Sequence, residues 1–389
     1  MEVAILGPSA RFLSGVSYFT MRLSNALSDL MGVKAVLFRK MLPRQLFLGW
    51  RRVGRELTSL RFDERVEVHE ILDWYNPLTW LQASRIVRDV DALILQWWTS
   101  SVAHMYLAIE VLNMKRKPVV VEFHEVVDPL EYSILPIRAY SRVAGRLVRG
   151  LAAHFVVHSP ADRELIGKAY GVERERITVI PHGIYDHYER IPRDEARAAI
   201  GVEEEFVILF FGLLRPYKGV RYLVKAFERL PEGVLKESRL LIVGEPWEDR
   251  ESIELARRSE VKDRITVVDR YVSDDEVSLY FSASDVLVLP YTRASQSGVA
   301  HIGMFFGLPI IASEVGGLKE SLGKYEGARL VGLSVEEIAE GLTEVFERRG
   351  RRYEPPKELS WGNIARRWKN LLELLTSGES GGTVSFMGC

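Results

Sequence analysis

Cysteine is almost absent from this chain of 389 residues, since the single one, Cys389, is the last residue. One cysteine cannot build an internal disulfide framework, a cysteine-based metal cluster or a thiol active site in the body of the chain. The composition therefore predicts a reducing compartment, with the cytosol as the default expectation.

Long apolar runs are also missing. The longest, Phe206–Leu214, is far shorter than the ~18 residues of a membrane span and predicts a buried strand. The opening run, Met1–Gly7, is ended at once by Pro8, so we expect no signal peptide. We expect a soluble protein that at most rests on a membrane surface.

The chain has no excess of either charge, since it contains 52 basic and 53 acidic residues. This balance argues against a general nucleic-acid binder. The eight histidines form no metal-ligand spacing such as H-E-x-x-H, and no G-x-S-x-G elbow occurs. We therefore expect neither a bound metal nor a serine hydrolase.

Short runs rich in valine, isoleucine and leucine alternate with amphipathic helical patterns along the whole chain. Such runs are typical of parallel strands buried on both faces of a sheet. The first predicted series is Val3–Leu6, Val33–Phe38, Ala92–Trp97, Val119–Phe123, His154–Val157 and Ile177–Ile180. The second is Val207–Phe211, Leu240–Val243, Ile265–Val268, Val286–Leu289, Ile310–Ala312 and Arg329–Val331. Two series predict an α/β protein with two Rossmann-like domains.

The domain boundary is predicted in the polar stretch Gly183–Glu205. We expect a first domain over residues 1–189, a second over 190–360, and a last helix over 361–375. The tail, residues 376–389, is rich in glycine and serine, and we expect it to be flexible.

Two cations, Arg215 and Lys218, follow the apolar run that ends at Phe211, and a helical pattern begins at Gly219. In an open α/β sheet such a turn lies at the carboxyl end of a strand, where ligands bind. The two side chains would suit a diphosphate. The alternative is a pair of surface cations on a loop.

A second segment of interest follows the predicted strand Val286–Leu289. Ser297, Gly298 and Val299 open a helix, where free amide groups and the helix dipole favour an anion. Gly316 and Gly317 later allow another close approach of the backbone.

Basic residues gather in two stretches of the first half. The first, Phe38–Phe62, interleaves arginines with apolar residues and includes Arg44, Trp50, Arg51 and Arg52. The second places Arg138, Arg142, Arg146 and Arg149 on one face of a predicted helix. Both suit anionic lipid head groups or an anionic acceptor. The alternative for the arginine stripe is a solvated helix face.

In these ordered motifs the chain resembles the family 4 retaining glycosyltransferases of the GT-B fold. The resemblance covers nearly the whole chain and is strongest from Ile177 to Glu320. It rests on Ile180-Pro181-His182-Gly183, Gly212 to Gly219, Leu241-Ile242-Val243-Gly244, Asp285 to Pro290, Gly307-Leu308-Pro309, Val315-Gly316-Gly317, Ser14-Gly15-Val16-Ser17 and Phe123-His124-Glu125. It implies two Rossmann-like domains with parallel sheets facing a central cleft, with the last helix packing back on the first domain.

The sequence departs from the family pattern in two places. The paired glutamates of the family would fall at Ala294 and Ile302, and neither is acidic. This resembles a branch of the family that lacks the pair. The arginine that usually follows the glycine is Leu213 here, so Arg215 would have to reach the same phosphate.

The resemblance implies a role for each candidate residue. In the first domain His124 would contact the donor sugar, although its residue pattern alone favours a core histidine bonded to a carbonyl. In the second domain Arg215 and Lys218 would stabilise the leaving diphosphate. The other implied donor contacts are Ser14, Gly15, Val16, Gly212, Tyr271, Ser295, Gln296, Ser297, Gly298 and Val299.

The function implied is metal-independent transfer of a hexosyl group, with retention, from a nucleotide-diphosphate sugar to a glycan or lipid-linked acceptor. We expect no cofactor and no nucleic-acid partner. We do expect peripheral contact with the cytoplasmic face of a membrane. Two alternatives remain: a nucleotide-sugar epimerase of the same fold, and a non-catalytic subunit that binds nucleotide sugars.

Overall fold

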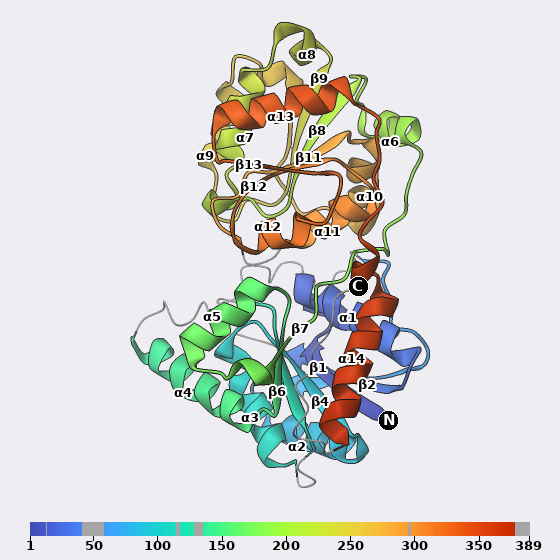
Figure 1. The fold of residues 1–389 in the computed structure, drawn as a ribbon, viewed down its shortest axis with the longest axis vertical. Helices are drawn as coiled ribbons and strands as arrows, with labels where there is room; N and C mark the ends of the chain where they lie inside the picture. Colours follow the sequence, from blue (N-terminus) through green and yellow to red (C-terminus); the bar gives the residue numbers. More distant parts are fainter. Residues whose placement is uncertain (13, 41–57, 114–116, 128–134, 295–296, 378–389) are drawn as a thin grey trace. The chain divides into compact units, whose positions relative to one another are not determined.

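The computed structural model describes residues 1–377 except 13, 41–57, 114–116, 128–134 and 295–296. The chain divides into two compact units (Figure 1). Unit 1 comprises Met1–Gly183 and the C-terminal segment from Glu358, and unit 2 comprises Ile184–Lys357. The division therefore falls at Gly183, slightly before the predicted boundary at residue 190. Tyr185 belongs to unit 2 because its ring packs beside Gly298 of that unit.

Unit 1 is built on a parallel sheet of seven strands in the order β3-β2-β1-β4-β5-β6-β7. The strands are β1 Glu2–Pro8, β2 Gly32–Lys40, β3 Val66–Asp73, β4 Ala92–Trp97, β5 Val119–Phe123, β6 His154–Val157 and β7 Ile177–Val179. The helices are α1 Gly15–Ser28, α2 Pro77–Ile86, α3 Ala103–Val111, α4 Leu135–Leu151, α5 Pro160–Tyr170 and α14 Trp361–Thr376.

Strand β3 is the one strand of this sheet that the sequence pattern did not predict. Its residues alternate between apolar and charged, as in Glu67, His69 and Glu70, and several of them are exposed. The reason is its place at the edge of the sheet, where the strand has only one neighbour and side chains on both of its faces reach solvent, so a continuous apolar run is not needed.

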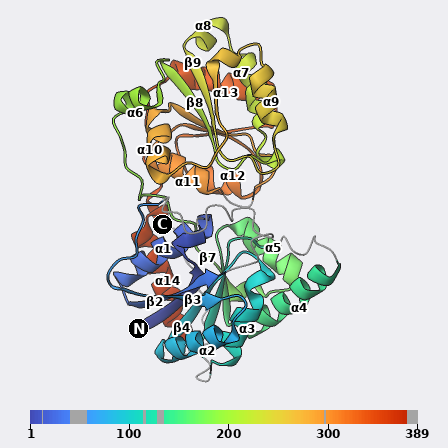
Figure 2. The same ribbon diagram turned by 180° about the vertical axis from the view of Figure 1, so that it is seen from behind.

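The sheet of unit 1 is buried on both faces, because apolar side chains of the strands alternate between two cores. Leu93 and Leu95 pack with α3, α4 and α5, whereas Ile94 packs with α1 and α14. Helix α14 lies beside α1 in both views (Figure 1 and Figure 2) and buries Trp368 completely. It runs to Thr376, one residue past the predicted end of the last helix at residue 375; residues 378–389 lie outside the described residues.

Unit 2 contains a parallel sheet of six strands in the order β10-β9-β8-β11-β12-β13. The strands are β8 Phe206–Phe211, β9 Ser238–Val243, β10 Ile265–Val268, β11 Val286–Leu289, β12 Ile310–Ser313 and β13 Ala328–Val331. The helices are α6 Arg193–Ile200, α7 Val220–Glu228, α8 Glu232–Lys236, α9 Glu251–Arg258, α10 Asp274–Ala283, α11 Gly298–Phe305, α12 Gly316–Leu322 and α13 Val335–Glu347. Helix α7 packs against α9 and α13, and α6 packs against α10.

The strand order of both sheets contains a switch point, which is the place where the direction of winding reverses. In unit 1 it lies between β1 and β4, and in unit 2 between β8 and β11. The loops that leave the two central strands diverge there, which opens a crevice at the carboxyl ends where ligands of open α/β sheets bind. Each unit therefore has one edge at which a binding site is expected.

Candidate functional site

The loop after β8 bears the two predicted cations and is held firmly against the end of β11. The backbone nitrogen of Thr292 donates a hydrogen bond to the carbonyl oxygen of Tyr217 over 2.8 Å. Gly219 has φ +67°, and a Cβ atom at this residue would lie 1.9 Å from the carbonyl oxygen of Pro290. Only glycine fits this left-handed close approach, so the turn Pro216–Lys218 has a defined place at the switch point.

Aromatic rings position both cations of this loop. The guanidinium carbon of Arg215 lies 4.9 Å from the ring centroid of Trp247, which follows β9. The ammonium nitrogen of Lys218 lies 3.8 Å from the ring centroid of Tyr291, which follows β11. Cations over ring faces are attracted by the ring quadrupole. Both side chains are half-buried, so their charges face a surface from which water is partly excluded.

The helix α11 begins beside the same loop. The side chain of Ser297 caps it by accepting a hydrogen bond from the nitrogen of Ala300 over 3.3 Å. Val299 lies next to the β8 loop, since a Cβ at Gly212 would be 3.3 Å from its Cγ2 atom. The structure thus brings Gly212 together with the predicted residues of α11. Gly298 and Val299 are half-buried, and Ser295 and Gln296 lie outside the described residues.

A third loop, after β12, completes this edge of unit 2. Gly316 has φ +44°, and a Cβ there would lie 2.1 Å from the carbonyl oxygen of Ala294. The nitrogen of Gly317 donates to that oxygen over 3.1 Å. Ile302, where the family would place a glutamate, is 6% exposed and part of the core. The position is therefore filled by packing.

Tyr271 lies in the loop after β10, the edge strand of the same sheet. It is half-buried, and its carbonyl oxygen accepts a hydrogen bond from Arg270 over 3.3 Å. Because β9 separates β10 from β8, Tyr271 lies at the outer border of the group of loops that Arg215 and Lys218 define.

In unit 1 the predicted glycine loop becomes the start of α1. Ser14 caps the helix, accepting a hydrogen bond from the nitrogen of Ser17 over 3.2 Å. Gly15 is exposed and Val16 half-buried. The loop follows β1, which borders the switch point, so these backbone groups lie at the carboxyl edge of the sheet.

His124 follows β5 at the same edge and is bonded to the buried Gln96, which is in turn bonded to the buried Glu122. Its Nε2 atom is hydrogen-bonded to the amide oxygen of Gln96 in β4. The amide nitrogen of Gln96 donates to Oε2 of Glu122 over 2.5 Å. Neither alternative for His124 described this arrangement, because the partner is a side chain and not a main-chain carbonyl.

Burial controls the protonation of this chain of side chains. Loss of solvation, and secondarily the neighbouring His158, hold the pKa of His124 well below its usual value. Burial raises the pKa of Glu122 to about 8. His124 is therefore a neutral imidazole at neutral pH, able to exchange hydrogen bonds without carrying charge.

Further histidines surround the same spot; the sequence suggested no role for His158, and His182 entered only as part of the family motif Ile180–Gly183. His158 follows β6 and His182 follows β7, and with His124 they surround the ring of Phe19 in α1. The distances between ring centroids are 4.7 Å for Phe19–His124, 5.1 Å for Phe19–His158 and 4.7 Å for Phe19–His182. The carboxyl ends of parallel strands lie at the same edge of the sheet, so the three histidines that follow β5, β6 and β7 lie close together there.

A sequence signal for this cluster did exist. Gln96 and Glu122 are polar residues inside otherwise apolar strands, and they are direct neighbours in the register of β4 and β5. Glu122 and His124 are two residues apart, which places both on one face of the strand. Only the strand order, however, makes Gln96 and Glu122 neighbours.

The predicted lipid-facing or acceptor-facing residues are only partly visible. Arg44, Trp50, Arg51 and Arg52 lie outside the described residues. On α4, Arg142 is exposed and Arg138 is half-buried. No helix of the described part of the chain has the length and apolar character to cross a membrane. Within that part, no three His, Cys, Asp or Glu side chains are grouped to hold a metal ion.

Comparison with solved structures defines the fold. The sucrose-phosphate synthase of Thermosynechococcus elongatus aligns with 97% of this chain and 100% of its own at a TM-score of 0.65 and 16% identity. WaaG, a glycosyltransferase involved in lipopolysaccharide biosynthesis, aligns with 98% of this chain and 100% of its own at a TM-score of 0.61 and 18% identity. Together with the two parallel-sheet units, these likenesses show the GT-B fold.

Sequence comparison places the chain within that class. The model described as Glycosyltransferase Family 4 matches residues 13–187, and that described as Glycosyl transferases group 1 matches residues 205–348. The chain belongs to the family 4 glycosyltransferases, as its motifs predicted.

Among curated relatives are two proteins named D-inositol 3-phosphate glycosyltransferase. That of Mycolicibacterium smegmatis is 28% identical over 221 residues, which is 55% of this chain and 49% of the relative. That of Xylanimonas cellulosilytica is 28% identical over 271 residues, 66% of this chain and 59% of the relative. The matches thus span about half of the length of these relatives.

Proposed function

We propose that the chain transfers a hexosyl group from a nucleotide-diphosphate sugar to a glycan or lipid-linked acceptor, with retention of configuration and without a metal ion. The observation that carries the proposal is the convergence of Arg215, Lys218 and the start of α11 at the switch point of unit 2. A diphosphate is the ligand that two cations and a helix start favour together.

The donor class is supported by what similar proteins bind. A structure with a TM-score of 0.65 and 17% identity is of Anabaena HepE in complex with UDP, and a further one contains UDP-glucose. In this chain the phosphates would lie against Arg215 and Lys218.

The chemistry assigned to these residues is electrostatic. Negative charge grows on the leaving diphosphate as the bond to the sugar carbon breaks, and preorganised cations stabilise it more than they stabilise the ground state. Arg215 and Lys218 would supply this charge in place of a metal. A departing phosphate oxygen would take the proton of the acceptor hydroxyl, so that the neutral His124 need only position the sugar.

A lipid-linked acceptor, at the cytoplasmic face of a membrane, is supported by the outer surface of α4. Val143, Leu147 and Leu151 are 62%, 53% and 51% exposed, and they recur at helical spacing beside the exposed arginines Arg142 and Arg146. An exposed apolar stripe next to cations is typical of helices that rest on anionic membranes.

The direct test uses a panel of UDP-, GDP- and ADP-sugars with the purified chain in EDTA. We expect one donor to raise the melting temperature and to be hydrolysed slowly without metal. A ligand at about 100 times its Kd adds about 2.7 kcal/mol to the free energy of unfolding. Failure of every nucleotide sugar to bind would refute the donor assignment, and hydrolysis only with added metal would refute metal independence.

Stereochemistry needs a separate measurement. The anomeric configuration of the product is read by NMR from the coupling of its anomeric proton. Retention is expected, and an inverted product would contradict that part of the proposal while leaving the donor assignment intact.

A further inference from the structure

A pocket of about 600 Å³ in unit 1 has a charged lining made only of arginines. Arg142, Arg146 and Arg149 come from α4, and Arg176 precedes β7. Phe155 and Tyr170 contribute aromatic surface to the lining. The sequence showed the stripe on α4, but only the fold adds Arg176 to it.

The pocket is distinct from the candidate site of unit 1. Arg176 lies just before β7 and Phe155 is the second residue of β6, so the pocket is at the amino-terminal edge of the parallel sheet. His124 follows the carboxyl end of β5. The two places therefore lie at opposite edges of one sheet.

Two of the four guanidinium groups are held in place by the protein. The guanidinium carbon of Arg149 lies 3.7 Å from the ring centroid of Tyr170, whose hydroxyl donates to the carbonyl oxygen of Val126 over 2.8 Å. Arg176 lies 5.3 Å from the ring centroid of Phe155 and donates to the carbonyl oxygen of Ala152 over 2.5 Å. Side chains held in this way lose little freedom when a ligand binds.

The other two guanidinium groups are exposed and one helical turn apart. Arg142 and Arg146 share a face of α4. Like charges at this spacing repel each other, so their closeness opposes folding unless an anion or solvent screens them. His154 responds to the same field, since burial and then the charge of Arg176 lower its pKa to about 4.

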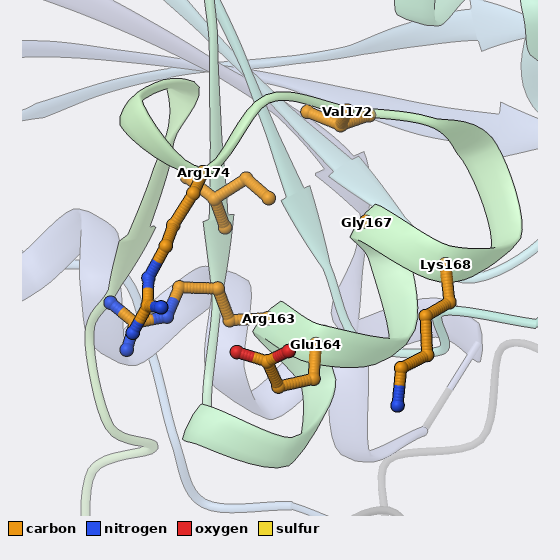
Figure 3. A pocket seen from close by; sticks show the side chains of 7 residues that line it. Arg163, Glu164, Gly167, Lys168, Val172 and Arg174 are labelled. Atoms are coloured by element: carbon orange, nitrogen blue, oxygen red, sulfur yellow. The ribbon is translucent and has the colours of Figure 1, made fainter.

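Other pockets in the described part of the chain mix the two signs of charge. Figure 3 shows a pocket of about 210 Å³ in which Arg163 and Arg174 extend to the same side with the carboxylate of Glu164 beside them. A pocket of unit 2 on α7 and α9 combines Lys225 with Glu251. Each of these linings includes at least one acid, whereas the lining of the four-arginine pocket includes none.

We propose that the four-arginine pocket binds a phosphate-bearing anion. Guanidinium groups match phosphate oxygens in paired hydrogen bonds, and four of them suit a diphosphate or two neighbouring phosphates. The anion could be a soluble phosphorylated compound or the head group of an anionic lipid, because the same helix exposes Val143 and Leu147. The proposal holds whether or not the chain transfers sugars.

The first experiment is calorimetric titration of the full chain with inorganic pyrophosphate. It is done in an Arg215→Ala/Lys218→Ala background, so that the predicted donor site makes no contribution. We expect Arg142→Ala/Arg146→Ala to weaken binding at least tenfold. The matched control is Arg366→Ala/Arg367→Ala, which removes two exposed arginines of α14 on the opposite face of the sheet. The control should bind like the parent.

A second arm separates the two sources of phosphate. The full chain is sedimented with vesicles of phosphatidylcholine alone or with added phosphatidylglycerol. Binding of the anionic vesicles that is lost in Arg142→Ala/Arg146→Ala and kept in the control indicates a lipid head group. Pyrophosphate binding without vesicle binding indicates a soluble ligand.

If the parent binds neither pyrophosphate nor anionic vesicles, or if Arg142→Ala/Arg146→Ala binds both as well as the control does, the pocket is not a phosphate site. Because both arginines are exposed, their removal leaves the melting temperature unchanged or higher, so loss of binding would not reflect unfolding.

Discussion

The side chains of Gln96 and His124 are hydrogen-bonded to each other at the ends of β4 and β5, and Gln96 is in turn bonded to the buried Glu122. A carboxyl oxygen accepts a hydrogen bond from an amide nitrogen. The amide oxygen of Gln96 is therefore turned toward His124, whose Nε2 atom must carry the proton. The orientation of the Gln96 amide thus sets the tautomer of the imidazole that we place beside the donor sugar.

We accordingly expect ¹⁵N NMR of His124 to show a neutral ring protonated at Nε2 from pH 6 to pH 8. Gln96→Leu should abolish this preference and reduce kcat about tenfold, because the ring is no longer oriented. A ring protonated at Nδ1 would contradict the assignment. It would mean that Glu122 donates its own proton to Gln96 and that the amide is reversed.

Arg215→Ala and Lys218→Ala should each slow transfer by about a hundredfold or more, since each removes a charge that stabilises the leaving diphosphate. Steady-state kinetics with the donor found in the panel gives kcat, and circular dichroism checks the fold. Arg221→Ala and Lys225→Ala, at exposed positions of the adjacent α7, are the matched controls. Near-normal turnover in both site variants would exclude the phosphate assignment.

Gly219→Ala should destabilise the chain by at least about 2 kcal/mol. The substitution adds the cost of a left-handed backbone for alanine to a collision with the carbonyl oxygen of Pro290, 1.9 Å from the new Cβ. Donor affinity should fall as well, because the turn that bears Lys218 must move. Gly233→Ala in α8 is the control, since its Cβ would meet no atom within 4 Å; it should be neutral or stabilising. Equal free energies of unfolding for the two variants would show that the loop rearranges around the new Cβ atom without a loss of stability.

The buried acids make a defined contribution to the pH dependence of stability. Burial raises the pKa of Glu122 and of Glu110 to about 8, from 4.5. The unfolded chain releases these protons near pH 4.5 and the folded chain retains them. Each acid therefore lowers the free energy of unfolding as pH rises from about 5 to 8, by at most about 1.4 kcal/mol per pH unit.

Glu122→Gln removes one of these two contributions. Urea unfolding at pH 5, 6.5 and 8 measures the free energy of unfolding of both proteins. That of the variant should rise relative to that of the wild type as pH rises, with no further relative increase above pH 8. Buried histidines with a lowered pKa, such as His301, make the free energy of unfolding rise with pH, which is the opposite of the effect of the acids. Because this contribution is present in both proteins, the difference between their free energies of unfolding isolates Glu122. Glu110→Gln should behave alike, and a constant difference across this range would show that Glu122 is ionised in the folded chain.

The sequence by itself determined the periodicity of this protein. Short runs rich in aromatic and β-branched residues, such as Phe206–Phe211, are typical of strands in a sheet that is covered on both faces. Local chemistry also placed Arg215 and Lys218 directly after one of these strands, and the order of short motifs identified the family. These features depend on neighbours in the chain, which is why they can be read along it.

The tertiary structure alone decided which strand ends meet. Parallel strands pair through crossovers, and the order of pairing follows from how whole faces pack, not from any one segment. That order set Gly219 against Pro290, put Gln96 beside Glu122 and added Arg176 to the arginines of α4. It also put the half-polar β3 at an edge. Sites made of residues distant in the chain exist only once packing has chosen their neighbours.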